Sequence, residues 1–408
     1  MSPVAGAYSP FVLNLSRADG TQRFSKISTT LPKGVLGKLK GIPYCSESAI
    51  AQAGDRNGPG EGSLEQTNPS CPAASNVGSV RVRAGTGSNP LAVNGNAYLA
   101  GPYKGAPLSL VIITPAVTGP FDLGAVVVRT ALNVDPEKLR IEAESDPLPT
   151  MLEGIPLNVR SISLQLDRPD FTLNPTSCDP MAVAVALIAP SGQLARLQDR
   201  FQVGGCRGLS FAPKLSLRVF GKTQRNGKPR LRAVLTTKPG EANIARAEVN
   251  LPRSEFLEQA HIRTICTRAQ FAQGRLPGEK CPPGSIYGKA KAWTPLLGRR
   301  LEGPVFLRSS SNTLPDLVAT LNGQVNVVLA GRIDTGPNGG LRTSFEVVPD
   351  APVSKFVLEM QGGKRGLLVN STNICRGKHR AIADFTGQNG RRHLFKPVVH
   401  AKCPGKRG

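Results

Sequence analysis

The chain consists largely of short apolar runs separated by turn-forming residues. Residues 77–84 and 286–293 alternate between apolar and polar positions, which is the pattern of a strand with one buried face. A continuous apolar triplet at 126–128 instead indicates a strand buried on both faces. Asp19-Gly20 lies between two apolar runs and predicts a hairpin turn. The pattern therefore predicts an all-β fold.

One pair of motifs occurs twice along the chain. Cys-[Ser/Thr]-x-x-x-[Ile/Phe]-Ala-Gln begins at Cys45 and again at Cys266. Cys-Pro-x-x-Ser-x-x-Gly follows, beginning at Cys71 and at Cys281. Since chance agreement at so many ordered positions is remote, the repeat predicts a duplicated unit.

Short helices are expected inside each copy of the repeat. Ser46 and Thr267 follow the first cysteine of each copy and are placed to cap a helix there. Ser254 is placed to cap a further helical turn over 255–258, with Phe256, Leu257 and Ala260 facing inward.

We therefore predict two tandem homologous β-sandwich units, each with a short disulfide-pinned helical or loop insertion. The first β-sandwich repeat takes residues 1–207, an extra strand and connector takes 208–228, and the strongly basic second repeat takes 229–408. The order of the strands within each unit does not follow from periodicity.

The eight cysteines divide four and four between the two halves, and no Cys-x-x-Cys occurs. The last two cysteines of each half are 28 residues apart in both copies. Eight free thiols in a reducing compartment are the alternative to disulfides, and we favour disulfides because of the repeated spacing. The predicted pairs are Cys45–Cys71, Cys178–Cys206, Cys266–Cys281 and Cys375–Cys403.

Disulfides predict a secreted or cell-surface protein. The first residues have neither the basic nor the apolar region of a signal peptide, so we expect the chain to be part of a longer secreted precursor, with a misassigned start as the alternative. No apolar run reaches the ~18 residues of a membrane span, and no transmembrane segment is predicted.

Several stretches resemble a group of large secreted β-repeat proteins of high-GC Gram-positive (actinobacterial) bacteria. The resemblance implies an extracellular location and a repeated β architecture, and it brings no known activity, ligand or catalytic residue. The matching stretches are Tyr8-Ser9-Pro10-Phe11, 15–20, 34–39, Gly101-Pro102-Tyr103-Lys104-Gly105-Ala106-Pro107 and 366–371.

Charge is distributed unequally between the halves. Residues 1–207 have 18 Lys/Arg and 16 Asp/Glu, net +2, whereas residues 208–408 have 33 and 12, net +21. A field of one sign attracts anionic partners, so the second unit is a candidate for docking on an anionic polymer. An unspecific solvated surface is the alternative. The candidate residues are Lys364, Arg365, Arg376, Lys378, Arg380, Arg391, Arg392 and Lys396.

Searches for catalytic motifs find no Gly-x-Ser-x-Gly, no His-Glu-x-x-His and no phosphate loop. His261 is expected to be packed or capped, and the other three histidines to lie on a basic surface. Glu142, Glu144 and Asp146 alternate on one face of a strand, where solvation is the simpler interpretation than a carboxylate pair. No catalytic residue, metal or cofactor is predicted.

The sequence favours a non-enzymatic extracellular structural, adhesion or binding module, with anionic cell-wall polymer or acidic polysaccharide as the possible partner. A secreted hydrolase acting on polysaccharide through a site without a known motif is the first alternative. Nucleic-acid binding by the basic C-terminal region is the second, and it is disfavoured because only Phe385 and Phe395 lie among the basic residues there. The sequence leaves the oligomeric state open.

Overall fold

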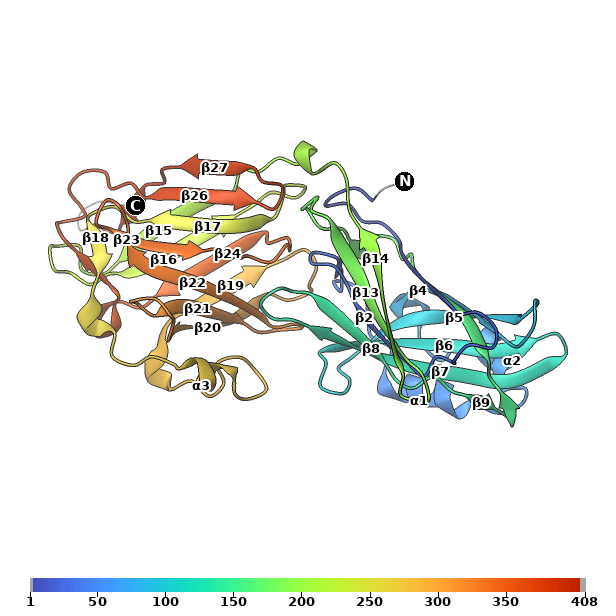
Figure 1. Ribbon diagram of the computed structural model, residues 1–408. Coiled ribbons are helices and arrows are strands. Elements are labelled where there is room, and N and C mark those ends of the chain that lie inside the picture. Colours follow the sequence, from blue (N-terminus) through green and yellow to red (C-terminus); the bar gives the residue numbers. More distant parts are fainter. Residues whose placement is uncertain (1–2, 404–408) are drawn as a thin grey trace. The chain divides into compact units, whose positions relative to one another are not determined.

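The computed structural model describes residues 3–403, which separate into two compact units (Figure 1). The first unit ends at Gly204 and the second begins at Gly205, and the segment Pro136–Leu139 also belongs to the second. Each unit is built on one large, mainly antiparallel sheet. No helix in the described part of the chain is long and apolar enough to cross a membrane.

The first unit has a ten-stranded sheet, two two-stranded sheets and short helices. Its elements are β1 (Phe11–Ser16), β2 (Lys26–Thr30), β3 (Leu36–Gly37), α1 (Glu47–Asp55), α2 (Glu61–Thr67), η1 (Ala73–Ser75), β4 (Asn76–Ala84), β5 (Leu91–Ala100), β6 (Leu108–Thr118), β7 (Phe121–Val134), β8 (Ile141–Ser145), β9 (Met151–Leu152), β10 (Ile155–Pro156), β11 (Val159–Leu166), β12 (Thr172–Leu173), β13 (Met181–Ile188) and β14 (Leu194–Phe201).

The second unit has a twelve-stranded sheet and one two-stranded sheet. Its elements are η2 (Cys206–Gly208), β15 (Lys214–Phe220), β16 (Arg230–Thr236), β17 (Ile244–Asn250), β18 (Glu255–Leu257), η3 (Gln259–His261), α3 (Arg268–Ala272), η4 (Pro283–Ser285), β19 (Ile286–Trp293), β20 (Leu301–Arg308), β21 (Asp316–Leu321), β22 (Val327–Thr335), β23 (Leu341–Phe345), β24 (Lys355–Met360), η5 (Gly363–Arg365), β25 (Leu368–Asn370), β26 (Ile382–Gly387), β27 (Arg392–Phe395) and β28 (Val399–Ala401).

The two large sheets have the same strand order. The first runs β1-β11-β4-β5-β6-β7-β8-β2-β13-β14, and the second runs β16-β24-β19-β20-β21-β22-β23-β17-β26-β27. The second sheet is longer because β15 and β28 are added beside β16. Strand registers also correspond: Leu13 pairs with Leu164 in the first unit, and Ala233 pairs with Leu358 at the same place in the second. Equivalent residues can therefore be compared position by position.

Each sheet curls so that its two halves face each other around an apolar interior. In the first unit, Leu15 of β1 belongs to the same buried cluster as Val183 and Val185 of β13. In the second, Leu235 of β16 packs against the cluster that contains Phe385 of β26. The predicted all-β, sandwich-like architecture is confirmed, although the two layers are halves of one sheet instead of two separate sheets.

The repeated cysteine motif forms the insertion that covers part of each sheet from outside. The Ser46 and Thr267 side chains accept hydrogen bonds from backbone N–H groups of Ala49 and Gln270, at 3.2 and 3.1 Å, so both predicted helix caps are present. Ser75 Oγ then donates to the Pro72 carbonyl at 2.7 Å, and Ser285 makes the same bond to Pro282. Local chemistry thus builds both insertions in the same way.

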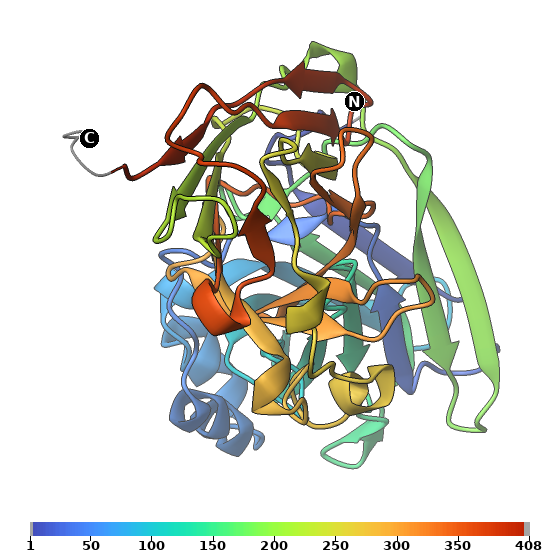
Figure 2. The ribbon, with the colours of Figure 1, turned by 90° about the vertical axis from the view of Figure 1, so that its left-hand side faces the viewer.

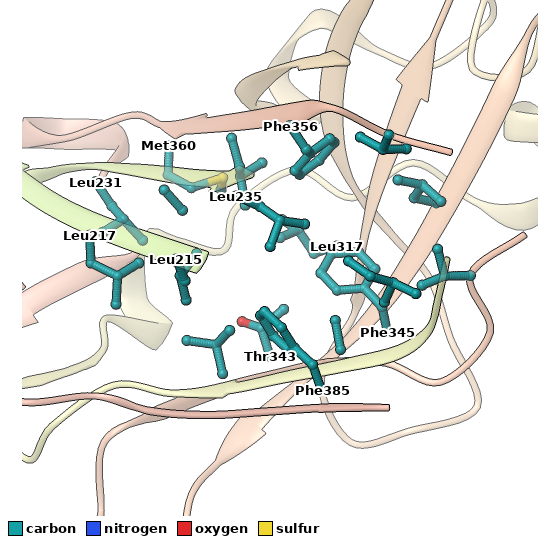
Figure 3. Close-up of a pocket in the computed structure, with 18 of the residues that line it drawn as sticks. Leu215, Leu217, Leu231, Leu235, Leu317, Thr343, Phe345, Phe356, Met360 and Phe385 are labelled. Carbon is teal, nitrogen blue, oxygen red and sulfur yellow. The ribbon is translucent and has the colours of Figure 1, made fainter. Parts of the chain in front are cut away.

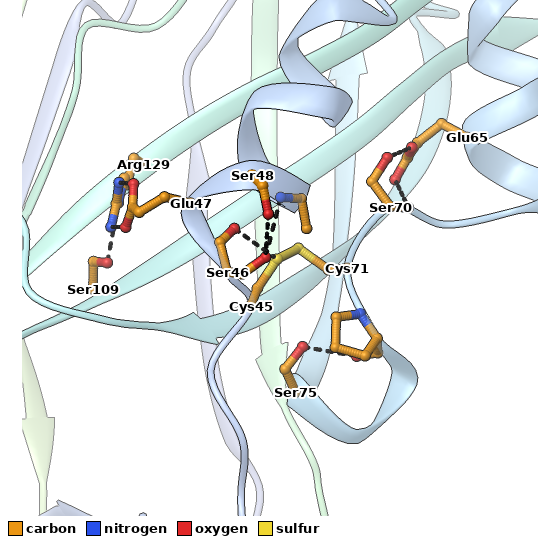
Figure 4. The surroundings of a disulfide bond; sticks show 12 residues. Cys45, Ser46, Glu47, Ser48, Glu65, Ser70, Cys71, Ser75, Ser109 and Arg129 are labelled. Atoms are coloured by element: carbon orange, nitrogen blue, oxygen red, sulfur yellow. Dashed lines mark hydrogen bonds and ion pairs between the residues drawn. A yellow bond between two sulfur atoms is a disulfide. The ribbon is translucent and has the colours of Figure 1, made fainter.

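In the first unit, a disulfide closes the insertion and an ion pair joins it to the sheet (Figure 4). Cys45 and Cys71 are bonded and fully buried beside Tyr98. Arg129 of β7 donates two hydrogen bonds of 2.7 Å to the Glu47 carboxylate at the start of α1. These bonds lower the pKa of Glu47 from its usual value.

All described cysteines are in disulfides. The pairs Cys45–Cys71, Cys266–Cys281 and Cys375–Cys403 are those that the spacing predicts, and Cys178 and Cys206 are disulfide-bonded as well.

The prediction of a helical turn over 255–258 is wrong, and a single 3-10 turn, η3, comes only at Gln259–His261. Glu255–Leu257 is strand β18, which pairs with β25, and the inward residue is Glu255, with Phe256 exposed. The hydroxyl of Ser254 bonds the Glu255 carboxylate at 2.6 Å and does not cap a helix. Tertiary pairing with β25 outweighs the local capping pattern here.

Candidate functional site

The eight basic side chains selected from the sequence are all exposed, but they fall into three groups. Arg391 and Arg392 lie at the turn between β26 and β27. Arg391 donates to the Arg207 carbonyl at 2.7 Å, and Arg392 forms an ion pair with Asp384 at 2.5 Å. Hydrogen bonds from Arg392 lower the pKa of Asp384, so the charge of Arg392 is largely balanced locally.

A second group gathers at the other end of the same hairpin. Arg380 donates to the carbonyl of Lys396 at 3.0 Å, and Arg376 and Lys378 lie in the loop that leads into β26. Six residues of β26 span about 20 Å, so this group lies a strand length from the turn.

The third group is Lys364 and Arg365 in η5, where Arg365 donates to the Gly284 carbonyl at 2.9 Å. The structure therefore brings together Arg376, Lys378, Arg380 and Lys396, and it does not assemble all eight into one face.

A larger basic surface, not found from the sequence, lies on the outer face of β15, β16, β24 and β19. One cross-strand row on this face runs through His400, Arg218, Arg232, Glu359 and Lys289. The strands that form it are labelled in Figure 1, and Figure 2 shows the same ribbon turned by 90°. We call this surface the outer basic face. Its basic residues are Lys214, Arg218, Arg230, Arg232, Lys289, Lys291 and Lys355.

Acidic side chains offset only part of this charge. Glu359 lies 3.4 Å from Arg232, and Glu302 of the neighbouring strand β20 lies 3.8 Å from Lys291. Both pairs are exposed, so each contributes little to stability. The outer basic face thus presents seven cations against two carboxylates, with side chains held in rows by the strand register.

Two aromatic rings lie at opposite ends of this face. Trp293 ends β19, and its ring lies 5.2 Å from Lys355 Nζ and 6.0 Å from the guanidinium of Arg300. Phe220 ends β15, with the Arg230 guanidinium 5.2 Å from its ring. Cation–π contacts hold these basic groups beside flat apolar rings, which gives the face both charge and stacking surfaces.

The first unit has the same face with different chemistry. Its equivalent row contains Val12, Gln165 and Ser79, in the places of Arg232, Glu359 and Lys289. Strand β15, which supplies Lys214 and Arg218, has no counterpart there. The same face of the first unit still has Arg81 and Arg83 of β4, at the places of Lys291 and Trp293. The outer basic face therefore accounts for part of the unequal charge of the two halves.

A sequence signal for this face exists in the period-two spacing of basic residues. Lys289-Ala290-Lys291-Ala292-Trp293 and Arg230-Leu231-Arg232 place charges on one side of each strand. The strand order that puts those strands side by side is not contained in the spacing, so the face was not predicted.

The three alternating acidic residues, Glu142, Glu144 and Asp146, are paired with cations. Glu144 forms an ion pair with Lys26, and Glu142 pairs with Arg140 at 3.0 Å. Asp146 accepts hydrogen bonds from Tyr103 at 2.6 Å and Lys104 at 2.5 Å. Desolvation opposes ionisation of Asp146, but these two donors lower its pKa. Asp135 and Glu137 lie in the segment between β7 and β8.

Three of the four histidines make hydrogen bonds or ring contacts, and His400 is exposed. Both ring nitrogens of His261 are hydrogen-bonded, to Gly366 O at 2.7 Å and Lys228 Nζ at 2.8 Å. His379 bonds the Arg376 carbonyl, and His393 stacks on Phe395 with the rings 4.8 Å apart. Among residues 3–403, no group of three or more His, Cys, Asp and Glu side chains could hold a metal ion.

Comparison with known proteins gives no family and one distant structural match to report. No family model and no curated protein matches the chain. A putative membrane anchored protein from Corynebacterium diphtheriae is one structural match, at 11% sequence identity and a TM-score of 0.22, covering 98% of this chain and 90% of that one. At this TM-score, the likeness carries no conclusion about fold or function.

Proposed function

We propose that this protein is a non-enzymatic extracellular module that docks on an anionic cell-surface polymer through the outer basic face. The observation that carries the proposal is the row of Arg218, Arg232 and Lys289 on a solvent-facing sheet, in which Glu359 stands between Arg232 and Lys289. Disulfide bonding of every described cysteine fits an oxidising, extracytoplasmic compartment.

The chemistry of the face favours a flexible chain of anionic groups. Its cations are spread over several strands about 4.8 Å apart, so successive charges of a polymer can contact successive strands. Each exposed contact contributes little alone, and many together make binding strong and dependent on salt. Trp293 and Phe220 add flat surfaces at which sugar rings can stack.

The test compares full-length variants with equal net charge. One variant, Arg218→Ser with Arg232→Gln and Lys289→Ser, removes three charges from the outer basic face. Its control, Lys364→Ser with Lys378→Ser and Lys396→Ser, removes three exposed charges elsewhere on the same unit. Binding to immobilised heparin and to purified wall teichoic acid is measured for both and for the wild type.

We expect the face variant to lose at least tenfold in affinity and the control to lose less than threefold. Equal losses would show that total charge, and not this face, governs binding. Preferential binding of a single-stranded oligonucleotide would favour the nucleic-acid alternative, and breakdown of the polymer during the assay would favour a hydrolase.

A further inference from the structure

The interior of the second unit contains a cavity of about 170 Å³ between the two halves of its sheet (Figure 3). Leu231 and Leu235 of β16 and Phe356 of β24 line one side. Thr343 of β23 and Phe385 of β26 line the other. The cavity therefore lies on the inner face of the same strands whose outer face is basic.

The lining is apolar. The polar side chains among the described residues that line it are Thr237, Asn243 and Thr343, and no charged side chain takes part. An apolar cavity that lacks polar partners does not hold water well, and a cavity of about 150 Å³ is known to stay dry and to bind small hydrocarbons. An occupant of this cavity must therefore be hydrocarbon.

The lining extends along the strands. It includes Leu231 and Leu235 of β16 and Thr237 just beyond its end, and six residue steps of a strand cover about 20 Å. A linear alkyl chain can follow a lining of this length, whereas a compact ring system contacts only part of it.

Small residues at two inner positions contribute to the space. Ala233 of β16 and Ala247 of β17 both line the cavity and are only partly buried. At the equivalent register positions the first unit has Leu13 and Ile27. Phe345 and Phe385, which pair with Ala247, are larger than their counterparts in the first unit, yet both line the cavity and do not close it.

We propose that the second unit holds a single hydrocarbon chain of a lipid in this cavity. The site is separate from the outer basic face, and it does not depend on the polyanion proposal. A polar lipid head has no charged partner among the lining residues, so it stays outside the sheet and only the chain enters.

The test places in the cavity the larger side chains that the first unit has at the equivalent positions. The double variant Ala233→Leu with Ala247→Ile fills the cavity, and Val234→Ile, on the outer side of β16, is the matched control. Fluorescence of cis-parinaric acid is titrated with the full-length wild type, the control and the double variant, and circular dichroism verifies that each is folded. Palmitate and phosphatidylglycerol vesicles then compete for the site and distinguish a free fatty acid from a membrane-held chain.

We expect saturable binding of one cis-parinaric acid per wild-type chain, at least a tenfold loss in the double variant and no loss in the control. Absence of wild-type binding, equal binding by the double variant, or displacement by neither competitor would overturn the proposal. If the double variant does not fold, the test uses the wild type instead. We then expect intermolecular NOEs between bound palmitate and the methyl groups of Leu235 and Leu358. Their absence at saturating palmitate would also overturn it.

Discussion

The buried carboxyl group of Glu255 gives a sharp prediction about stability. Its side chain is fully buried at the β18–β25 pair, opposite Asn370. Oε2 accepts a hydrogen bond from Ser254, whereas Oε1 has no hydrogen-bond partner among the described residues. Burial raises the pKa of Glu255, and the Ser254 hydrogen bond and the charge of His379 offset this only in part.

The first unit supplies a natural replacement. Glu255 is the fourth residue after Leu251, and Val35, the fourth after Leu31, is its equivalent, with 1% of its surface exposed. An unpaired buried polar atom costs about 1–3 kcal/mol, so Glu255→Val should raise the free energy of unfolding by that amount at pH 7. For a unit of about 200 residues, each kcal/mol corresponds to a rise in Tm of about 2–4 °C.

The sign of the pH dependence follows from the raised pKa. A carboxyl group whose folded pKa exceeds its unfolded pKa stabilises the fold when it is protonated, and that stability is lost as pH rises through the folded pKa. The isosteric variant Glu255→Gln should therefore match the wild type near pH 4 and exceed it at pH 7. Urea unfolding at both pH values measures the difference. A destabilised Glu255→Gln at pH 7, or a difference that does not change with pH, would refute the argument.

Three further predictions concern the scaffold. Thiol titration of the denatured, unreduced protein should find no free thiol, and two or more thiols per chain would contradict the disulfide pattern. The Cys266→Ser/Cys281→Ser double variant should lose about 3 kcal/mol of unfolding free energy, because the disulfide that it removes closes a 15-residue loop. Gly288→Ala should lower the free energy of unfolding in urea by about 1–3 kcal/mol or more, because a Cβ there would lie 2.5 Å from the Glu359 carbonyl oxygen. An unchanged free energy of unfolding would show that β19 and β24 separate easily. Thr267→Ala should cost about 1 kcal/mol through loss of the α3 cap, and an unchanged Tm would show that the disulfide alone fixes the insertion.

Much of the scaffold is predictable because its signals are local. The alternation at 77–84 and 286–293 marks strands β4 and β19, and the caps at Ser46 and Thr267 mark the helices that follow the first cysteine of each motif. These features depend on neighbouring residues alone, so the sequence contains them directly.

The outer basic face and the cavity depend instead on long-range pairing. Arg218 and Lys289 are distant in sequence, and they share a face only because β16 and β24 lie between their strands. The small side chains of Ala233 and Ala247 contribute to a cavity only because the fold places their strands around one interior. The helical turn predicted after Ser254 is wrong for the same reason, because Glu255 pairs with Asn370 of β25, more than a hundred positions later in the chain.

The most direct test of the proposed docking surface is the salt dependence of heparin binding by the full chain. Each cation that contacts an anionic group releases a counterion, so removing one such contact lowers the slope of log K against log salt by about one. The variant Arg218→Ser with Arg232→Gln and Lys289→Ser should reduce the slope by about three, and the matched lysine variant should leave it nearly unchanged. An unchanged slope in the face variant, with binding retained, would contradict the account.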